Sequence, residues 1–235
     1  MKKFITAVAA AALVAGASAP AMAQDANDAV AFFALISTPY GALPAVASGA
    51  ANAGPSLDVR YGRYSFEGSD YSINNIGVGG NFAAAGGRMG IMLGIVSGED
   101  DDNAKMAGID YNRSLMSRPV GASTSSSISL ALHPALGYGK ADEGDLNAIS
   151  AAVDLPVQLS MAAGKTMQFA AHLAPGFGYG RLSDGDLSES GTRATLGGGV
   201  SLLNVGGGLG VNLGFRKIFL DEAPTQWGLG MSWSR

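Results

Sequence analysis

Cysteine is absent from this chain of 235 residues, so disulfides, thiolate metal sites and cysteine nucleophiles are excluded. Charge is also scarce, at 14% of residues, and the acidic residues outnumber the basic ones by 19 to 15. An acidic balance argues against nucleic acid as a partner. Beyond the N-terminus no apolar run reaches about 18 residues, so no membrane-spanning helix is expected there.

Residues 1–23 have the pattern of a signal peptide. A positive start, "MKK", precedes the apolar stretch "FITAVAAAALVAGASA", and "AMA" before Gln24 suits signal peptidase. The alternative is a hydrophobic core helix at the N-terminus. Export from a bacterial cytoplasm is the expectation, and loss of Lys2 and Lys3 would leave a mature chain with a net charge near −6.

Residues 24–55 differ from the rest of the chain because they are rich in alanine and interrupted by proline. A short apolar patch runs from Val30 to Ile36. The segment could be a linker, a short helix, an extra strand or a plug, and the sequence leaves these four alternatives open.

Residues 56–235 follow a period of two, which is the pattern of β-strands. In the clearest stretch, Thr166 to Arg181, large apolar side chains alternate with small or polar ones. The pattern predicts ten strands, or eight if the third and fourth are misread. The predicted strands are 57–66, 72–84, 87–97, 106–117, 124–139, 146–161, 165–181, 190–204, 207–219 and 225–234.

The face opposite the apolar one decides between a soluble and a membrane fold. It consists mostly of Gly, Ala, Ser, Thr and Asn and has few charges, whereas a solvated face usually carries many. A membrane barrel has the inverse arrangement, with apolar side chains toward lipid and small or polar ones toward the lumen. We therefore predict an all-β, antiparallel, up-and-down transmembrane barrel in the outer membrane, with a soluble sandwich or lipocalin-like barrel as the alternative.

The connections between the predicted strands alternate between two kinds. One kind is short and nearly uncharged, as in "AAAGG" and "AAGK", and the other is acidic, as in "GEDDDNAK" and "ADEGD". Short periplasmic turns and longer external loops are typical of bacterial barrels. The acidic connections are therefore expected on the outside.

A repeated junction, "GYGKADEGD" and "GYGRLSDGD", marks the predicted outer ends of two strands. Four of the five upward strands end with an aromatic residue, any residue and then a basic one, which suits the boundary between hydrocarbon and lipid phosphates. Solubilising charge is the alternative explanation. The predicted lipid-headgroup contacts are Arg63, Lys140, Arg181 and Lys217, and the predicted aromatic girdle is Tyr61, Tyr138, Tyr179, Phe215, Trp227 and Trp233. Arg113 points outward in mid-strand and suggests a bulge or a wrong register.

Charged and histidine side chains of the opposite parity are predicted to face the lumen. They could line a pore or form an acid–base site, but a satisfied network inside a narrow barrel is the favoured interpretation. The predicted lumen residues are Asp58, Arg60, Arg88, Asp110, His133, Asp154, His172, Arg193 and Arg216.

Other ligand sites find little support. The acidic connections supply carboxylates, but none matches the calcium loop D-x-[DN]-x-[DN]-G. The glycine runs "GVGGNF" and "VGGGLG" precede no predicted helix, and no G-x-S-x-G elbow occurs. No metal, cofactor or catalytic residue is predicted.

The signal peptide, the ten alternating segments, the hairpin "LPVQL…AAGK…HLAPGFGYGR" and the aromatic last strand resemble the bacterial outer-membrane β-barrel superfamily, in its small, opacity-protein-like group. The resemblance covers residues 56–235 and implies contact with the barrel-assembly machinery, which reads a terminal aromatic residue. Here Ser234 and Arg235 follow Trp233, a departure from that pattern. Members of the group are structural, adhesive or narrow-channel proteins.

Three functions remain as hypotheses. The first is a non-enzymatic outer-membrane barrel, structural or surface-interacting, that contacts lipopolysaccharide or another anionic lipid; its external partner is unknown. The second is a narrow, porin-like channel for small solutes. The third is a lipid-modifying enzyme, which is disfavoured because His133 and His172 have lumen parity, away from lipid.

Overall fold

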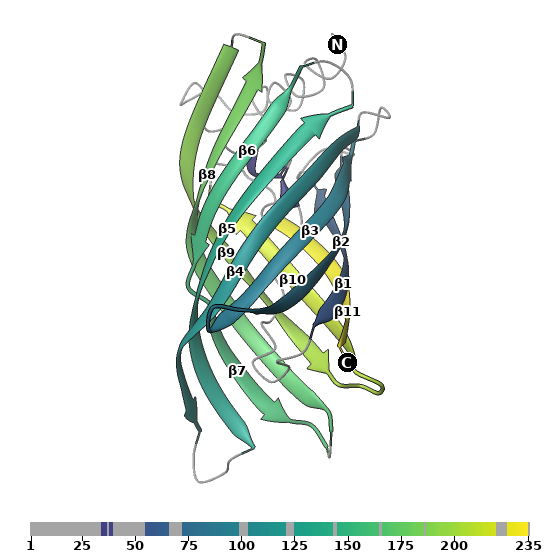
Figure 1. Cartoon of the computed structure of the whole chain (residues 1–235), viewed down its shortest axis with the longest axis vertical. Helices are drawn as coiled ribbons and strands as arrows, with labels where there is room; N and C mark the ends of the chain where they lie inside the picture. The colour runs from purple at the N-terminus through teal and green to yellow at the C-terminus, as the bar shows by residue number, and fades with distance from the viewer. Residues whose placement is uncertain are drawn as a thin grey trace.

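The chain forms a closed barrel of antiparallel strands in a computed structural model (Figure 1). The predicted signal peptide and the acidic connections "EGSD" and "DEAP" lie outside the described residues, as do parts of the other three acidic connections. The structure describes residues 34–36, 38–39, 55–65, 72–98, 103–120, 125–142, 145–164, 166–185, 187–219 and 225–234. The strands are β1 (Ser56–Ser65), β2 (Ser72–Ala84), β3 (Gly87–Ser97), β4 (Asn103–Pro119), β5 (Ser126–Ala141), β6 (Asn147–Asp154), β7 (Val157–Ala162), β8 (Gln168–Asp184), β9 (Leu187–Leu203), β10 (Leu209–Ile218) and β11 (Thr225–Ser234).

Strands that follow each other in the chain pair with each other, apart from β6 and β7, and the first strand closes the sheet against the last. The seam between β1 and β11 runs from the pair Ser56–Ser234 to the pair Tyr64–Gln226. Because β6 and β7 both lie between β5 and β8, they form one span, and the barrel has ten. The prediction of ten strands is confirmed and the alternative of eight is wrong.

Proline explains why the sixth span is divided into β6 and β7. Pro156 has no N–H and cannot donate to the ladder. The pairing nevertheless continues in register, since Asp154 faces His133 and Val157 faces Leu130 on β5. Backbone bonds of 2.9 Å bridge the break, from Leu155 N to the carbonyl of Pro175 and from Ala131 N to the carbonyl of Pro156.

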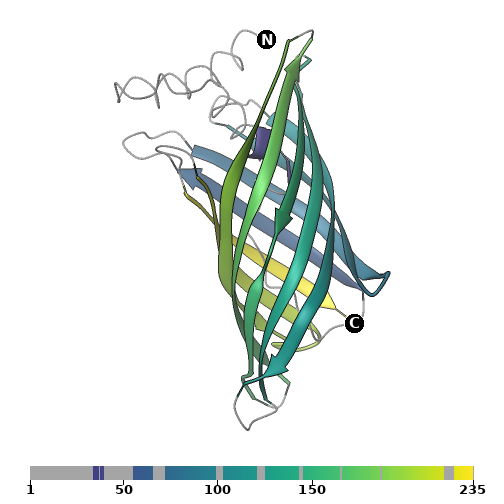
Figure 2. The same ribbon diagram turned by 90° about the vertical axis from the view of Figure 1, so that its left-hand side faces the viewer.

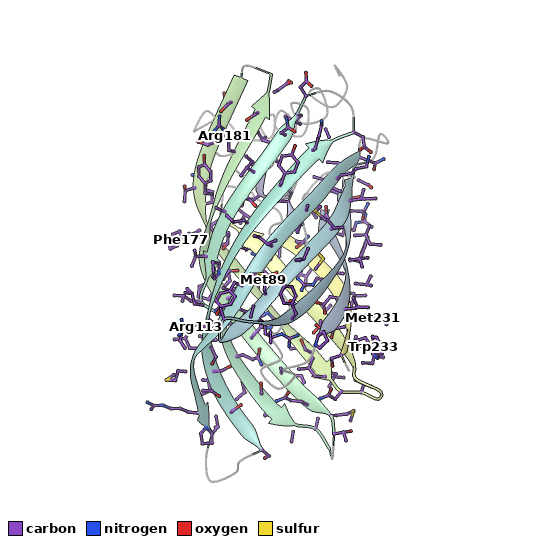
Figure 3. The ribbon with its side chains drawn as sticks, in the orientation of Figure 1. Met89, Arg113, Phe177, Arg181, Met231 and Trp233 are labelled. Atoms are coloured by element: carbon purple, nitrogen blue, oxygen red, sulfur yellow. The ribbon has the colours of Figure 1, made fainter. Side chains whose placement is uncertain are left out.

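The outer surface is apolar, as expected for a wall that faces lipid. Phe177 is 66% exposed and projects outward from β8 in Figure 3. Small side chains and glycines occupy the alternate, inward positions, for example along β8, where Ala170 and Ala174 are buried. Other exposed apolar side chains of this surface are Val59, Ile76, Val78, Ile91, Leu93, Ile109, Leu136, Ile149, Leu173, Leu213 and Leu229.

The two ends of the barrel differ. The acidic-loop end is defined by Ser65, Ser97, Ala141, Asp184 and Ile218, which precede the acidic connections. The turn end is the opposite one, where β1 begins and β11 ends. At the turn end, β7 and the adjoining parts of β4, β5 and β8 extend below the end of β11 (Figures 1 and 2).

The outward side chain of Arg113 lies low on the barrel, where the strands end at uneven heights. Figure 3 shows Arg113 at about the same height as Met231 and Trp233, which lie toward the turn end of β11. A register shift does occur in β4, but between Ser114 and Met116, after Arg113. The prediction of an irregularity is thus confirmed, whereas its use as the explanation for Arg113 is wrong, because Arg113 faces outward in regular register with Leu132.

Part of the N-terminal segment lies inside the barrel. Residues 34–36 are helical, and Thr38 donates from both its N–H and its Oγ1 to the carbonyl of Leu35, at 3.2 and 2.9 Å. Leu35 and Thr38 are 0% exposed, and Ile36 is 2% exposed. No helix among the described residues is long and apolar enough to cross a membrane.

Candidate functional site

The centre of the lumen holds a network of charged side chains. His133 on β5 lies between two carboxylates, with Nε2 3.0 Å from Asp110 Oδ2 and Nδ1 3.6 Å from Asp154 Oδ2. Arg216 on β10 approaches the same Asp154 oxygen at 3.7 Å. Thr195 Oγ1 donates to Asp154 Oδ1 at 3.4 Å. Side chains from β5, β9 and β10 therefore contact Asp154, and His133 links it to Asp110 on β4. Asp154 is 1% exposed.

Glycine in the barrel wall makes room for this network. Gly90 faces Asp110 in register, and Gly176 faces Asp154. A Cβ at either glycine would clash with the carboxylate of its partner. The glycines thus allow charged side chains to lie against the wall of a crowded lumen.

A second polar group lies in the lumen near the turn end, on β1, β2 and β3. Asp58 Oδ2 accepts a hydrogen bond from Asn81 and lies 3.9 Å from Arg60 Nη2. Arg88 Nη2 donates to Ser56 Oγ at 3.1 Å. These contacts pair charges with polar groups inside the barrel, which limits the cost of their burial.

The two remaining predicted lumen residues are His172 and Arg193. His172 on β8 is 7% exposed and faces Gln158 on β7 and Gly199 on β9 in register. Arg193 on β9 donates from Nη1 to the carbonyl of Thr192 at 2.7 Å. Both histidines are in the interior, so neither presents a base to lipid.

The buried N-terminal segment occupies the lumen at the acidic-loop end. Thr38 Oγ1 is 2.7 Å from Ser150 Oγ on β6. A Cβ at Gly137 would lie 2.6 Å from Thr38 Cβ, and one at Gly108 would lie 3.1 Å from Pro39 Cγ. The apolar cluster that includes Leu35 and Ile36 contains Tyr64, Ile73, Val96, Ala104, Met106 and Ile218, most of them close to the strand ends. The wall is thus shaped to hold the segment.

The residues predicted for the girdle and the rim have outward positions. Tyr138 and Tyr179 are 45% and 37% exposed, and Tyr138 Oη donates to Asn147 Oδ1 at 2.7 Å. Phe215 packs against Trp227 with ring centroids 5.5 Å apart. Lys217 Nζ lies 5.9 Å from the ring centroid of Phe219. Trp227 is at the acidic-loop end of β11 and Trp233 at its turn end, where Trp233 Nε1 donates to the carbonyl of Gly207.

Lys105 is a rim residue that sequence reasoning did not find. It was assigned to the connection "GEDDDNAK", whereas β4 begins at Asn103 and places Lys105 outward and exposed. Its Nζ is 2.7 Å from Asp142 Oδ1. Period-two parity would have identified it only if the strand had been extended toward the acidic connection. Among the described residues, no group of three or more His, Cys, Asp or Glu side chains could hold a metal ion.

A closed antiparallel barrel with an apolar exterior and a polar interior is the architecture of a bacterial outer-membrane β-barrel. Such a barrel pairs every strand edge within itself, so it can cross lipid without unsatisfied backbone groups. The fold is thus that of a membrane-spanning β-barrel with ten strands.

Comparisons with solved structures show a likeness of fold alone. No protein-family model and no curated protein matches the chain. Among solved structures, Ail, the attachment invasion locus protein of Yersinia pestis, is 13% identical, covers 77% of this chain and 97% of its own, and has a TM-score of 0.30. The β domain of the Bordetella autotransporter BrkA is 14% identical, with coverages of 78% and 100% and a TM-score of 0.44. Omp33 of Acinetobacter baumannii is 11% identical, with coverages of 78% and 100% and a TM-score of 0.33.

Proposed function

We propose that this protein is a non-enzymatic outer-membrane barrel, closed by its own N-terminal segment, whose function is structural or surface-interacting. The observation that carries the proposal is the burial of residues 34–36, 38 and 39 at the acidic-loop end. Leu35 and Thr38 are wholly inaccessible to solvent, and Gly108 and Gly137 leave space for the segment. Such a barrel presents its outer rim and loops, and not a pore, to the surroundings.

The charged network supports the same proposal from the middle of the lumen. Asp154 contacts His133, Arg216 and Thr195, so side chains from β5, β9 and β10 meet it across the interior. Buried charges in mutual contact resist rearrangement, because separating them would leave a charge unpaired in a poorly hydrated place. The network is therefore a second obstruction between the two ends.

A narrow channel is the second candidate, and specific polar groups favour it. Asn75, Ser201 and Asn212 are 1%, 2% and 3% exposed, and each has a side-chain atom without a hydrogen-bond partner among the described residues. Buried polar groups without protein partners are commonly hydrated. A hydrated inner wall would allow small solutes to pass through the lumen once the N-terminal segment leaves it.

Conductance in planar bilayers tests the proposal. The mature chain should insert without producing a steady open channel, because the segment and the network block the lumen. A steady ohmic conductance from the mature chain would contradict closure and favour the channel.

A cross-link decides whether residues 34–39 cause the closure. The chain has no native cysteine, so the double variant T38C/S150C introduces the only possible disulfide, at a site where the two side-chain oxygens are 2.7 Å apart. We expect this disulfide to form in the assembled barrel, and not in the control T38C/S160C, because Ser160 lies on β7 toward the turn end. A cross-link in the control and not in T38C/S150C would contradict the position of the segment. Conductance that appears only after reduction of T38C/S150C would identify a channel that the segment gates.

A further inference from the structure

Two lysines face each other directly at the rim of the acidic-loop end. Lys105 on β4 and Lys140 on β5 are partners in register, and both are exposed on the outer face. Like charges directly opposite each other on neighbouring strands destabilise a sheet. Asp142 offsets one of the two charges through its contact of 2.7 Å with Lys105. The pair keeps a net positive charge that a bound anion would neutralise.

Arg181 extends this positive surface around the rim. It lies on β8, next to β6, where it faces Ile149, and Lys140 faces Asn147 on the other side of β6. Arg181 Nε donates to Ser188 Oγ at 2.9 Å, which orients the plane of the guanidinium. In Figure 3, Arg181 lies beyond Phe177 toward the acidic-loop end. The basic cluster thus comprises Lys105, Lys140 and Arg181, and spans β4 to β8.

The tyrosines beneath the basic cluster place it at a lipid boundary. Tyr138 and Tyr179 come two residues before Lys140 and Arg181 on the same outward face. Tyrosine rings are enriched where hydrocarbon meets headgroups, and basic side chains just beyond them reach phosphate. The three cations are therefore at the height of lipid phosphates.

The other two rim cations have different surroundings. Arg63 on β1 faces Trp227 and Asn74 in register, and Lys217 lies near the ring of Phe219. Neither has a second cation directly opposite it in register. Among the described residues, a directly opposed pair of cations on the outer face thus occurs only between β4 and β5.

We propose that Lys105, Lys140 and Arg181 form a binding site for the phosphate groups of an outer-leaflet glycolipid that carries more than one phosphate. Ammonium and guanidinium groups form strong, charge-assisted hydrogen bonds with phosphate, and Arg can bind it through two nitrogens. A headgroup with several phosphates would contact the lysine pair and Arg181 together. The site rests on the proposed function, because it requires the acidic-loop end to lie in the outer leaflet.

Binding of lipopolysaccharide to the full mature chain in detergent tests the site. The triple variant K105A/K140A/R181A should bind lipopolysaccharide at least about tenfold more weakly than the native chain, because it loses three charge-assisted contacts. The matched control R63A/K217A removes two rim cations from the other side and should change the affinity by less than about threefold. Dephosphorylated lipopolysaccharide should bind native chain and triple variant alike.

The outcomes separate this site from the proposed function. Each variant is first checked for a heat-sensitive compact band on a gel, which reports an assembled barrel. If both the native chain and the triple variant assemble and bind lipopolysaccharide with equal affinity, the site is overturned and the proposed function still stands. Equal binding of native chain to phosphorylated and dephosphorylated lipid would also overturn it. Displacement of the lipid by millimolar inorganic phosphate would show that the cluster binds free phosphate and would overturn the lipid assignment.

Discussion

At the scale of single residues, the interior of this barrel depends on contacts that parity alone does not provide. Parity predicted that His133, Asp154 and Arg216 face the lumen, and the structure brings His133 and Arg216 to within 3.6 and 3.7 Å of the Asp154 carboxylate. Which lumen residues touch depends on the stagger and curvature of the strands. Sequence reasoning therefore named the set, but could not name Asp154 as its centre.

Asp154 carries the first residue-scale prediction. D154N should lower the free energy of unfolding by about 3 kcal/mol, because it removes the carboxylate charge beside a buried Arg216. Denaturant unfolding of the barrel in lipid vesicles measures the change. D142N makes the same substitution in the exposed pair with Lys105 and should cost less than about 1 kcal/mol. Equal losses in the two variants would show that burial does not set the strength of the Asp154 contacts.

Lys105 and Arg113 show two different limits of the sequence pattern. Lys105 was missed because the acidic run before it obscured the start of β4, which begins at Asn103. Arg113 was recognised as outward, but its height could not be inferred, since a strand pattern does not show where the membrane ends. In both cases the missing information was the position of a strand relative to its neighbours.

At the scale of strands, alternation was a sufficient guide to the fold. It predicted all ten spans, and the span 146–161 remains continuous in register even though Pro156 divides it into β6 and β7. The ends were less accurate: β4 runs to Pro119 and β5 to Ala141, beyond the predicted limits. Extra residues at the ends of a span lie near aqueous surroundings, where the alternation between lipid and lumen weakens.

The strand-scale prediction concerns depth along the outer wall. Leu229 is 56% exposed near the middle of β11, between Trp227 and Trp233. L229R should lower the free energy of unfolding in lipid vesicles by about 2–4 kcal/mol, because it places a charge near the bilayer midplane. Leu57 faces Trp233 at the turn end, and L57R should cost about 0–1 kcal/mol. A larger cost for L57R than for L229R would contradict the assigned membrane boundary.

At the scale of the whole molecule, the closed sheet predicts resistance to detergent. Each strand is paired on both sides, so detergent finds no exposed sheet edge at which to separate the strands. The outer-membrane fraction should contain a compact, faster-migrating band on mild detergent gels without boiling, and a slower band after boiling. A soluble periplasmic band that does not shift would contradict the membrane barrel.

The position of residues 34–39 was beyond sequence reasoning. Their composition allowed a linker, a helix, a strand or a plug, and composition does not distinguish the inside of a barrel from its outside. The structure places Leu35, Ile36 and Thr38 in the lumen through tertiary contacts with residues far along the chain, such as Ser150. The fold and the wall residues that face the lumen were thus predictable, whereas the place of the N-terminal segment inside the lumen was not.

The enclosed segment also constrains the order of assembly. Residues 34–36, 38 and 39 precede β1, and β1 pairs with β11, which follows all the other described strands in the chain. The segment must either be inside when this seam forms or enter later through an open end. In the first order, an unfinished barrel leaves Leu35 and Ile36 in contact with water, and joining the first strand to the last removes them from it. Pairing of β1 with β11 and burial of the N-terminal segment then occur in the same step of assembly.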